Sequence, residues 1–566
     1  MWHGLPLDFS LAGYLTAIPG FLLIASAWTK SSILRRIRQG YFGIIAFVMS
    51  CIFIVDLGLY GFWGFRLDAT PIFYFFSSPK DAMASVSFWF ILLGILAMLI
   101  YAAILYGIFY AVLIREKAPL KIPYQRQYVS LVLLLLTAAL FIPIRGGFSV
   151  STMNLSKVYY SQNQRMNHAA INPAFSFMYS ATHQNNFDKQ YRFMDPKVAD
   201  ELLTEMLDKP VAVTDSIPQI LNTQRPNIIF IILESFSTHL METMGGQPNV
   251  AVNMDKFGKE GVLFTNFYAN SFRTDRGLAS IISGYPGQPS TSIMKYPEKT
   301  DGLPSIPRSL KNAGYSLEYY YGGDADFTNM RSYLVSSGIE KIISETDFPL
   351  SERPGKWGAP DHALFQRFLK DLKEEKQQEP FFKIVQTSSS HEPFEVPFYR
   401  LDDKVLNAFA YADSCVGDFV RQYKETPMWK NTLIVLVPDH LGAYPRPVEN
   451  PLEGHTIPLI LIGGAVKEPR VVDTYASQID IAATLLSQLG LPHDDFTFSK
   501  NIFNPSSPHF GYFTEPTLFG MVTAENQLVY NLDANTVQID EGTEKGANLE
   551  KGKAFLQKLY DDLAKR

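Results

Sequence analysis

At residues 227–233 the chain reads Asn-Ile-Ile-Phe-Ile-Ile-Leu, and Glu234-Ser-Phe-Ser follows directly. A continuous β-branched and apolar run of this length predicts a strand that is buried on both faces of a parallel sheet. Similar runs occupy 316–321, 381–386, 432–437 and 457–462, and helical patterns lie between them, for example at 361–373 and 402–424. Strands that alternate with helices predict an α/β sandwich with a mostly parallel central sheet.

Polar and acidic residues follow these strands where each strand ends. Open α/β sheets bind ligands at the carboxyl ends of their strands, so these side chains are expected to meet at one edge. Each one alone is more simply explained as a turn or capping residue, but their joint placement favours a site. Oxygen and imidazole donors suit a divalent metal such as Mn²⁺ or Zn²⁺, and no CxxC or HExxH motif competes for that role. The residues concerned are Glu234, Asp324, His391, Asp439 and His440.

Thr274 is the candidate nucleophile. It lies between a strand-like run, 262–268, and an apolar helical pattern, and so at or just before a helix N-terminus, where backbone N–H groups and the helix dipole favour anions. The simpler interpretation is an N-cap. Arg273 and Arg276 flank this threonine, however, and a cap needs no neighbouring cations. A hydroxyl whose pKa is lowered by a metal can attack phosphorus, and Arg276 is a candidate for binding the substrate anion.

The composition of the 566 residues excludes several classes of protein. Charged residues make up 19% and hydrophobic residues 47%, and the mean hydropathy is +0.01. Disordered chains and basic proteins that coat nucleic acids do not have this balance, so no nucleic-acid partner is expected. The chain contains two cysteines, one of them inside an apolar run, which excludes a disulfide-stapled scaffold.

The first 145 residues are predicted to form a transmembrane bundle. They carry a net charge of +6, against −11 for the rest of the chain, and contain long uncharged stretches. About 20 apolar residues span a bilayer, so four spans are expected, at 9–29, 39–60, 84–114 and 127–144. Residues 57–76 are rich in aromatics but interrupted by charges and proline, which indicates an interfacial segment rather than a fifth span.

Two short basic loops, 30–38 and 115–126, set the expected orientation. The positive-inside rule places both in the cytoplasm, and everything after residue 145 then faces outward. We expect a juxtamembrane arm at 146–225, an extracytoplasmic catalytic domain at 226–500, and a C-terminal hairpin and helix at 501–566 that complete the domain. This topology also puts the N-terminus outside without a signal peptide, which suggests a further span upstream of Met1.

Four motifs carry a resemblance to a known family. They are Ile232-Leu-Glu-Ser-Phe236, Arg273-Thr-Asp-Arg-Gly277, Ser283-Gly-Tyr-Pro286 and Pro438-Asp-His440. Together they resemble the alkaline phosphatase superfamily over roughly residues 226–490. More narrowly, they are similar to membrane-anchored lipoteichoic acid synthase-like and phosphoethanolamine transferase enzymes, often labelled sulfatases. The resemblance implies an alkaline-phosphatase-like α/β domain behind an N-terminal bundle of five spans.

The resemblance also implies roles for individual residues. One Mn²⁺ or Zn²⁺ would be held by Glu234, Thr274, Asp439 and His440, with Thr274 as the covalent nucleophile. His391 and His455 match histidines that contact the transferred phosphate or its head group, and Asp324 falls near the head-group pocket. Lipoteichoic acid synthases carry Trp-Asn-Arg after a phenylalanine, whereas this chain reads Phe327-Thr-Asn-Met330, which counts against phosphoglycerol recognition and polymerisation. Trp357 is more simply a core or loop aromatic than part of that pocket.

The function expected from this sequence is transfer of a phosphoglycerol or phosphoethanolamine head group. The donor would be a phospholipid and the acceptor an extracytoplasmic glycan or lipid of the cell envelope, at the cytoplasmic membrane of a bacterium. The alternative is a phosphodiesterase or phospholipase C-like hydrolase that uses the same residues. A sulfatase is less favoured, because sulfatases form formylglycine from a Cys/Ser-x-Pro-x-Arg segment, and the chain has threonine at position 274 and arginine at 276.

Overall fold

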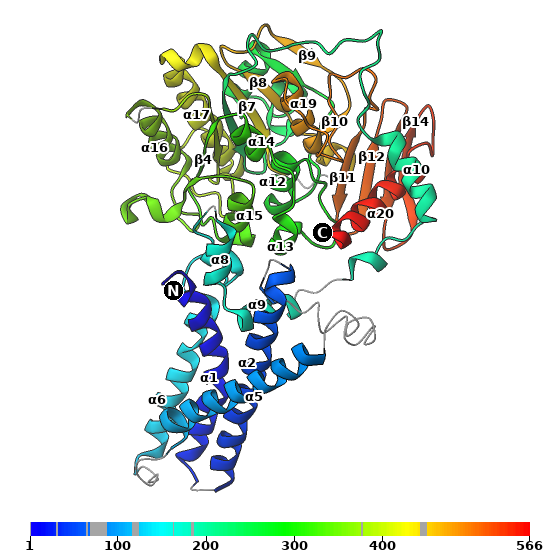
Figure 1. Cartoon of the computed structure of the whole chain (residues 1–566). Coiled ribbons are helices and arrows are strands. Elements are labelled where there is room, and N and C mark those ends of the chain that lie inside the picture. Colours follow the sequence, from blue (N-terminus) through cyan, green and yellow to red (C-terminus); the bar gives the residue numbers. More distant parts are fainter. Residues whose placement is uncertain are drawn as a thin grey trace. The chain divides into compact units, whose positions relative to one another are not determined.

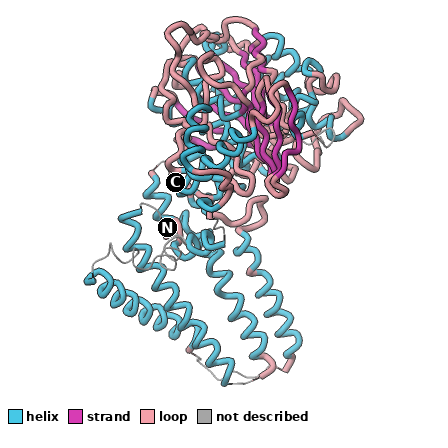
Figure 2. Tube along the Cα trace, turned by 90° about the vertical axis from the view of Figure 1, so that its right-hand side faces the viewer, coloured by secondary structure: helices cyan, strands magenta, loops and turns pink. Residues whose placement is uncertain are grey.

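The computed structural model describes residues 2–29, 32–63, 66–67, 88–115, 124–161, 163–182, 186–374, 377–441 and 450–566. The chain divides into two compact units, residues 1–185 and 186–566. The strands of the described residues all lie in the second unit (Figure 2). The finer boundaries expected at residues 146, 226 and 501 stay predictions.

The first unit is helical, and four of its helices are long and apolar enough to cross a membrane. These candidate spans cover Trp2–Ser26, Ser32–Gly61, Trp89–Ile114 and Arg126–Arg145. The expected set of four apolar N-terminal helices is therefore confirmed, although residues 84–87 of the third expected span lie outside the described residues. Among the described residues, the α-helices of this unit are α1 (Leu5–Ser26), α2 (Ser32–Trp63), α5 (Phe88–Phe109), α6 (Arg126–Ala139), α7 (Phe141–Arg145), α8 (Gln164–Ala170) and α9 (Pro173–Thr182), and a π-helix (Tyr110–Ile114) continues α5.

Glycine lets helix α1 approach its neighbours closely. A Cβ at Gly13 would lie 2.7 Å from the Ile144 side chain, and one at Gly20 would lie 2.6 Å from Oγ1 of Thr137. The two glycines are seven residues apart, so they share one face of the helix. Small residues of this kind let apolar helices pack through their backbones, where lipid gives no hydrophobic driving force. Within the expected interfacial segment 57–76, helix α2 continues to Trp63, and residues 64–65 and 68–76 lie outside the described residues.

The second unit is built on an eight-stranded, mostly parallel sheet, as expected (Figure 1). The strand order is β5-β4-β6-β1-β7-β8-β2-β9, in which β8 alone runs antiparallel to its two neighbours. The strands are β1 (Asn227–Leu233), β2 (Val262–Phe264), β4 (Ser316–Tyr321), β5 (Lys341–Ile343), β6 (Phe381–Gln386), β7 (Thr432–Pro438), β8 (Leu459–Ile462) and β9 (Arg470–Val472). Two further strands form a separate short parallel pair. They are β3 (Phe267–Tyr268), which follows β2 in the sequence, and β10 (Ala476–Ser477), which follows β9.

Both faces of this sheet are covered by hydrophobic side chains. Along β1, Ile228 and Phe230 belong to one core, whereas Ile229 and Ile231 belong to the other. This alternation explains why the strand is a continuous apolar run. One core includes residues of α12 (Thr274–Ser283), α14 (Ile306–Asn312), α15 (Met330–Ser336), α19 (Ile481–Gln488) and α20 (Leu549–Lys565); the other includes residues of α11 (Val252–Glu260), α16 (Asp361–Glu374) and α17 (Lys404–Tyr423). This unit also contains the short helices α13 (Pro297–Thr300) and α18 (Pro451–Gly454).

The C-terminal residues form a separate antiparallel sheet with a helix against it. Its four strands are β11 (Gly511–Glu515), β12 (Leu518–Val522), β13 (Asn526–Asn531) and β14 (Thr536–Gly542). The expected hairpin at 528–539 is its second half. Helix α20 packs close to the sheet, because a Cβ at Gly552 would lie 2.3 Å from the Phe519 ring. Helix α10 (Pro196–Met206) packs against α20, so this part of the expected arm lies in the second unit.

An ion pair between Asp208 and His493 fastens the segment after α10 to the loop after α19. Nε2 of the histidine lies 3.4 Å from Oδ2 of the aspartate. The hydrogen bond from Asp208 raises the pKa of His493. Burial raises the pKa of Asp208, but hydrogen bonds from His493, Ser507 and the Asn501 N–H outweigh this and lower it. Each charge therefore stabilises the other in the folded state.

We expect His493→Gln to destabilise the protein more in mild acid than in alkali. A raised histidine pKa contributes stability that is complete below the unfolded value of about 6.5 and is lost as the pH rises through the folded value. The lowered pKa of Asp208 contributes stability above about 3.9, which is lost only as the pH falls through its folded value. The melting temperature should drop by about 2 °C near pH 5.5 and by less near pH 9. An equal loss at both pH values would contradict this linkage.

Candidate active site

The expected site lies at the carboxyl ends of β1, β6 and β7. Strand β1 pairs in parallel with both neighbours, and its last residue, Leu233, is opposite Pro438. Glu234 and Asp439 therefore leave the sheet side by side. The Asp439 N–H donates to the Leu233 carbonyl at 3.1 Å, and the Glu234 N–H donates to the side-chain Oγ1 of Thr387 at 2.9 Å, so hydrogen bonds hold the first residue after each strand.

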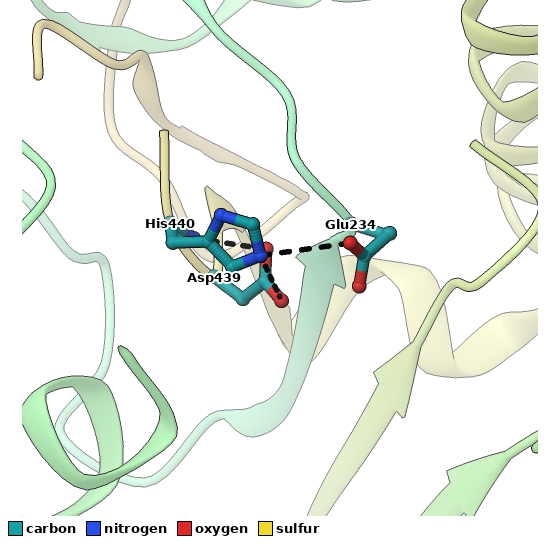
Figure 3. A group of neighbouring side chains, drawn as sticks. All are labelled: Glu234, Asp439 and His440. Atoms are coloured by element: carbon teal, nitrogen blue, oxygen red, sulfur yellow. Dashed lines mark hydrogen bonds and ion pairs between the residues drawn. The ribbon is translucent and has the colours of Figure 1, made fainter. Parts of the chain in front are cut away.

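Glu234, Asp439 and His440 converge on one point (Figure 3). Ligand atoms of the three side chains all lie within 4.8 Å of one another. Nε2 of His440 is 3.6 Å from Oε1 of Glu234 and 3.6 Å from Oδ2 of Asp439. The carboxylates are 5% and 0% exposed, so their charges lie close together with little water to screen them.

Details of this cluster fit a divalent cation. Oδ1 of Asp439 accepts hydrogen bonds from the backbone N–H groups of Ser235 and His440, at 2.9 and 2.8 Å, whereas its buried Oδ2 has no hydrogen-bond partner among the described residues. Nδ1 of His440 lies 2.6 Å from the Leu441 carbonyl. A histidine that donates Nδ1–H to a carbonyl presents its Nε2 lone pair to a metal. The donor set suits Mn²⁺ or Zn²⁺.

Electrostatics within the cluster are strongly coupled. Burial raises the pKa of Glu234, but the hydrogen bond and charge of His440, with the charge of His391, outweigh it and lower that pKa to about 2. Burial and the neighbouring Glu234 charge raise the pKa of Asp439 to about 7. Burial lowers the pKa of His440, yet the two carboxylates raise it to about 9 overall. The two buried carboxylates thus concentrate negative charge at the point where a cation would bind.

Thr274 lies against this cluster as the first residue of α12. Arg273 holds the N-cap position with extended backbone, so the interpretation of Thr274 as a capping residue is wrong. Its hydroxyl instead approaches the Asp439 carboxylate and lowers the pKa of that acid. Gly277 permits the approach, because a Cβ there would lie 1.7 Å from the Asp439 carbonyl oxygen. The helix N-terminus therefore rests directly on the end of β7.

The other expected substrate residues differ in how close they lie to the cluster. His391 lies in the loop after β6, near enough for its charge to lower the pKa of Glu234, and Oγ of the preceding Ser390 donates to the Glu234 carbonyl at 2.7 Å. Arg276 is buried and directed elsewhere: its Nε donates to the Gln288 carbonyl at 2.8 Å and its Nη1 pairs with Asp275 at 3.3 Å. Asp324 lies in the loop after β4, where Oδ1 accepts from the Asp326 N–H at 2.9 Å.

His455 pairs with Glu515, a residue that the sequence analysis did not identify. Its imidazole is fully buried, with Nδ1 2.8 Å from the Ala269 carbonyl and Nε2 3.1 Å from Oε1 of Glu515. The ring also stacks on Phe513, with centroids 4.0 Å apart. Glu515 ends β11 and is 30% exposed, so it, and not His455, is the partly accessible member of the pair. Nothing in the residue pattern around position 515 marks it as functional.

Comparisons with known proteins show which families and relatives this chain is similar to. The family described as Sulfatase matches residues 226–491. Lipoteichoic acid synthase-like YvgJ of Bacillus subtilis is 23% identical over 311 residues, which are 49% of this chain and 50% of the relative. Phosphoglycerol transferase I of Xanthomonas campestris is 24% identical over 320 residues, which are 52% of this chain and 45% of the relative. The chain spans about half the length of the curated relatives it matches.

Solved structures confirm the expected fold of the second unit. A protein of the alkaline phosphatase superfamily from Vibrio parahaemolyticus is 26% identical, with a TM-score of 0.58, and the match covers 66% of this chain and 98% of that one. The lipoteichoic acid synthase LtaP from Listeria monocytogenes is 20% identical, with a TM-score of 0.52, and covers 65% and 97%. The α/β domain thus has the alkaline-phosphatase-like architecture that the motifs indicated.

Proposed function

We propose that this chain is a membrane-anchored, metal-dependent phosphotransferase that moves a phosphoglycerol or phosphoethanolamine head group from a phospholipid to an envelope glycan or lipid. The observation that carries the proposal is the cluster of Glu234, Asp439 and His440 with Thr274 held against it at a helix N-terminus. The names of the relatives, lipoteichoic acid synthase and phosphoglycerol transferase, support the same reaction class.

In the proposed first step, Thr274, already ionised to the alkoxide, attacks the phosphorus of the lipid phosphodiester through its Oγ1. The bond from phosphorus to the diacylglycerol oxygen breaks, and the head group stays on Thr274 as a phosphodiester. A divalent cation held by Glu234, Asp439, His440 and Thr274 would lower the pKa of the attacking hydroxyl and neutralise phosphate charge. The N–H groups at the start of α12 favour the phosphate oxygens.

In the second step, a hydroxyl of the acceptor attacks the same phosphorus and releases Thr274. We assign His391 to both steps, and its location in the loop after β6, with its charge acting on Glu234, supports this. It would give a proton to the departing diacylglycerol oxygen and take one from the acceptor hydroxyl. Water in place of the acceptor would make the same site a hydrolase.

The location of the reaction is part of the proposal. Four helices are long and apolar enough to anchor the chain in a membrane, where both the donor and the diacylglycerol product reside. The basic loops at 30–38 and 115–126 support an orientation with the α/β domain on the outer face of a bacterial cytoplasmic membrane.

The test is release of diacylglycerol by the purified full chain in detergent. Phosphatidylglycerol and phosphatidylethanolamine, each labelled in its acyl tails, are incubated separately with Mn²⁺, with Zn²⁺ or with EDTA. We expect labelled diacylglycerol from one donor only, dependent on a metal and absent in Thr274→Ala, which excludes contaminating lipases. Product that appears only when a glycan or lipid hydroxyl is supplied indicates a transferase. No release from either lipid with either metal would refute the phospholipid donor.

A further inference from the structure

Residues 355–361 connect two of the loops that form the site. The Ala359 N–H donates to the Gly322 carbonyl at 2.9 Å, in the loop after β4. Gly358 has a φ of +80°, and a Cβ there would lie 2.1 Å from the Gly322 oxygen, so only glycine allows this close approach. This hydrogen bond and the close backbone contact hold residues 358–359 against the loop after β4.

The second partner is the loop after β6, which carries His391. Asp361 is fully buried, and its Oδ1 accepts from the N–H groups of Ser388 and Ser389, at 2.9 and 3.2 Å. The Asp361 N–H donates in turn to Oγ of Ser389 at 2.9 Å. A buried carboxylate that accepts two backbone N–H groups fixes the path of that backbone. The chain leading to His391 is thus held from the side of α16.

Trp357 makes the contact with His391 itself. The indole and imidazole centroids are 3.8 Å apart, with 40° between the ring planes. The indole Nε1–H donates to the Glu392 carbonyl at 2.6 Å, and the Phe327 ring is T-shaped to the indole, with centroids 6.0 Å apart. One side chain therefore touches the loops after both β4 and β6, and it contacts the imidazole of His391.

We propose that Trp357 is a positioning residue for the head-group transfer, which acts by holding the His391 imidazole toward the transferred phosphate. This inference rests on the proposed function of the site. A histidine in a loop, without a packed neighbour, would sample several side-chain rotamers. The indole face restricts the imidazole, and the bond to the Glu392 carbonyl restricts the backbone beside it. Trp357 belongs to the site and is not merely the loop aromatic that its sequence position suggested.

The alternative is that Trp357 only stabilises the fold, and a double-mutant cycle separates the two roles. The variants are Trp357→Ala, Trp357→Phe, His391→Ala and the double alanine variant. Trp429→Ala is the matched control, because both tryptophans have a T-shaped aromatic neighbour and a lysine ammonium over the ring. For Trp357 the lysine is Lys356, at 5.3 Å; Trp429 has Tyr423 at 6.2 Å and Lys424 at 5.2 Å. It lies in a 3-10 turn (Pro427–Asn431) just before β7, at the opposite end of that strand from Asp439.

We expect Trp357→Ala to lower kcat for diacylglycerol release by about 10²-fold, as displacement of a catalytic group by about 1 Å does. Trp357→Phe should recover part of this loss, and Trp429→Ala should lose nothing. In the His391→Ala background the same Trp357→Ala change should cost less than about twofold, because its partner is gone. An unchanged cost in that background, or wild-type turnover in Trp357→Ala, would overturn the proposal.

Chemical modification of His391 tests whether Trp357 covers its imidazole, and it does not depend on enzymatic turnover. Modification of His391 by diethylpyrocarbonate, mapped by peptide mass spectrometry, should be several-fold faster in Trp357→Ala and unchanged in Trp429→Ala. If the wild type releases no diacylglycerol but this acceleration is found, the proposed function fails and the positioning contact stands. An unaltered His391 rate in Trp357→Ala refutes the positioning role, whatever the activity.

Discussion

Replacement of Thr274 by alanine is expected to leave a folded protein that binds Mn²⁺ but transfers no head group. Removing a nucleophile from a site of this kind costs at least about 10⁴-fold in turnover. The methyl of alanine occupies less space than the threonine side chain, and Arg273 keeps the N-cap position, so helix α12 should persist. Measurement of diacylglycerol release, together with Mn²⁺ affinity by titration calorimetry, checks both halves of this expectation.

Thr274→Ser is the control, because it keeps a hydroxyl at the helix N-terminus. We expect it to retain measurable turnover and to give the same covalent adduct as the wild type, in which the head group is attached to residue 274. Intact-mass analysis of protein quenched during turnover should show this adduct, and its mass identifies the head group. Diacylglycerol release by Thr274→Ala at the wild-type rate would exclude a threonine nucleophile.

Much of the second unit could be predicted because parallel strands buried on both faces have a simple signature. The runs at 227–233 and 432–437 are uninterrupted by charge, and each became a central strand. The same topology explains why Glu234 and Asp439 could be paired across some 200 residues of sequence: they follow adjacent parallel strands by one residue. At this edge of the sheet, the strand ends predicted from local sequence are therefore the ones that the strand order brings together.

Contacts between loops could not be predicted in this way. Trp357 and Glu515 lie in segments without periodicity, and their partners, His391 and His455, are separated from them by 34 and 60 residues in the sequence. The sheet order likewise places β2 and β9 beyond the antiparallel β8, which short strands of three or four residues do not reveal. The expected role of His455 toward phosphate stays a prediction. In the structure its imidazole is buried and paired with Glu515, so any such role must include this contact.

Gly277→Ala is the second change for which we expect a large effect, although it alters no reacting group. In most helices this substitution stabilises the fold by about 1 kcal/mol. Here the added Cβ would lie 1.7 Å from the Asp439 carbonyl oxygen and 2.7 Å from the carbonyl carbon, so helix α12 or the end of β7 must move. Overpacking of this kind costs about 1–3 kcal/mol, and a shift of about 1 Å between Thr274 and the acidic cluster costs about 10²-fold in turnover.

Gly258→Ala in helix α11 is the matched control for Gly277→Ala. That glycine is also helical and buried, but the three atoms nearest to a Cβ there all belong to the Leu263 side chain, the closest at 3.4 Å, which is ordinary van der Waals contact. We expect Gly258→Ala to keep wild-type turnover and an equal or higher melting temperature, whereas Gly277→Ala lowers both. Because Gly277 donates no atom to the chemistry, a loss confined to Gly277→Ala would show that the backbone contact between α12 and Asp439 sets the position of Thr274. Equal behaviour of the two variants would mean that the nucleophile does not depend on this contact.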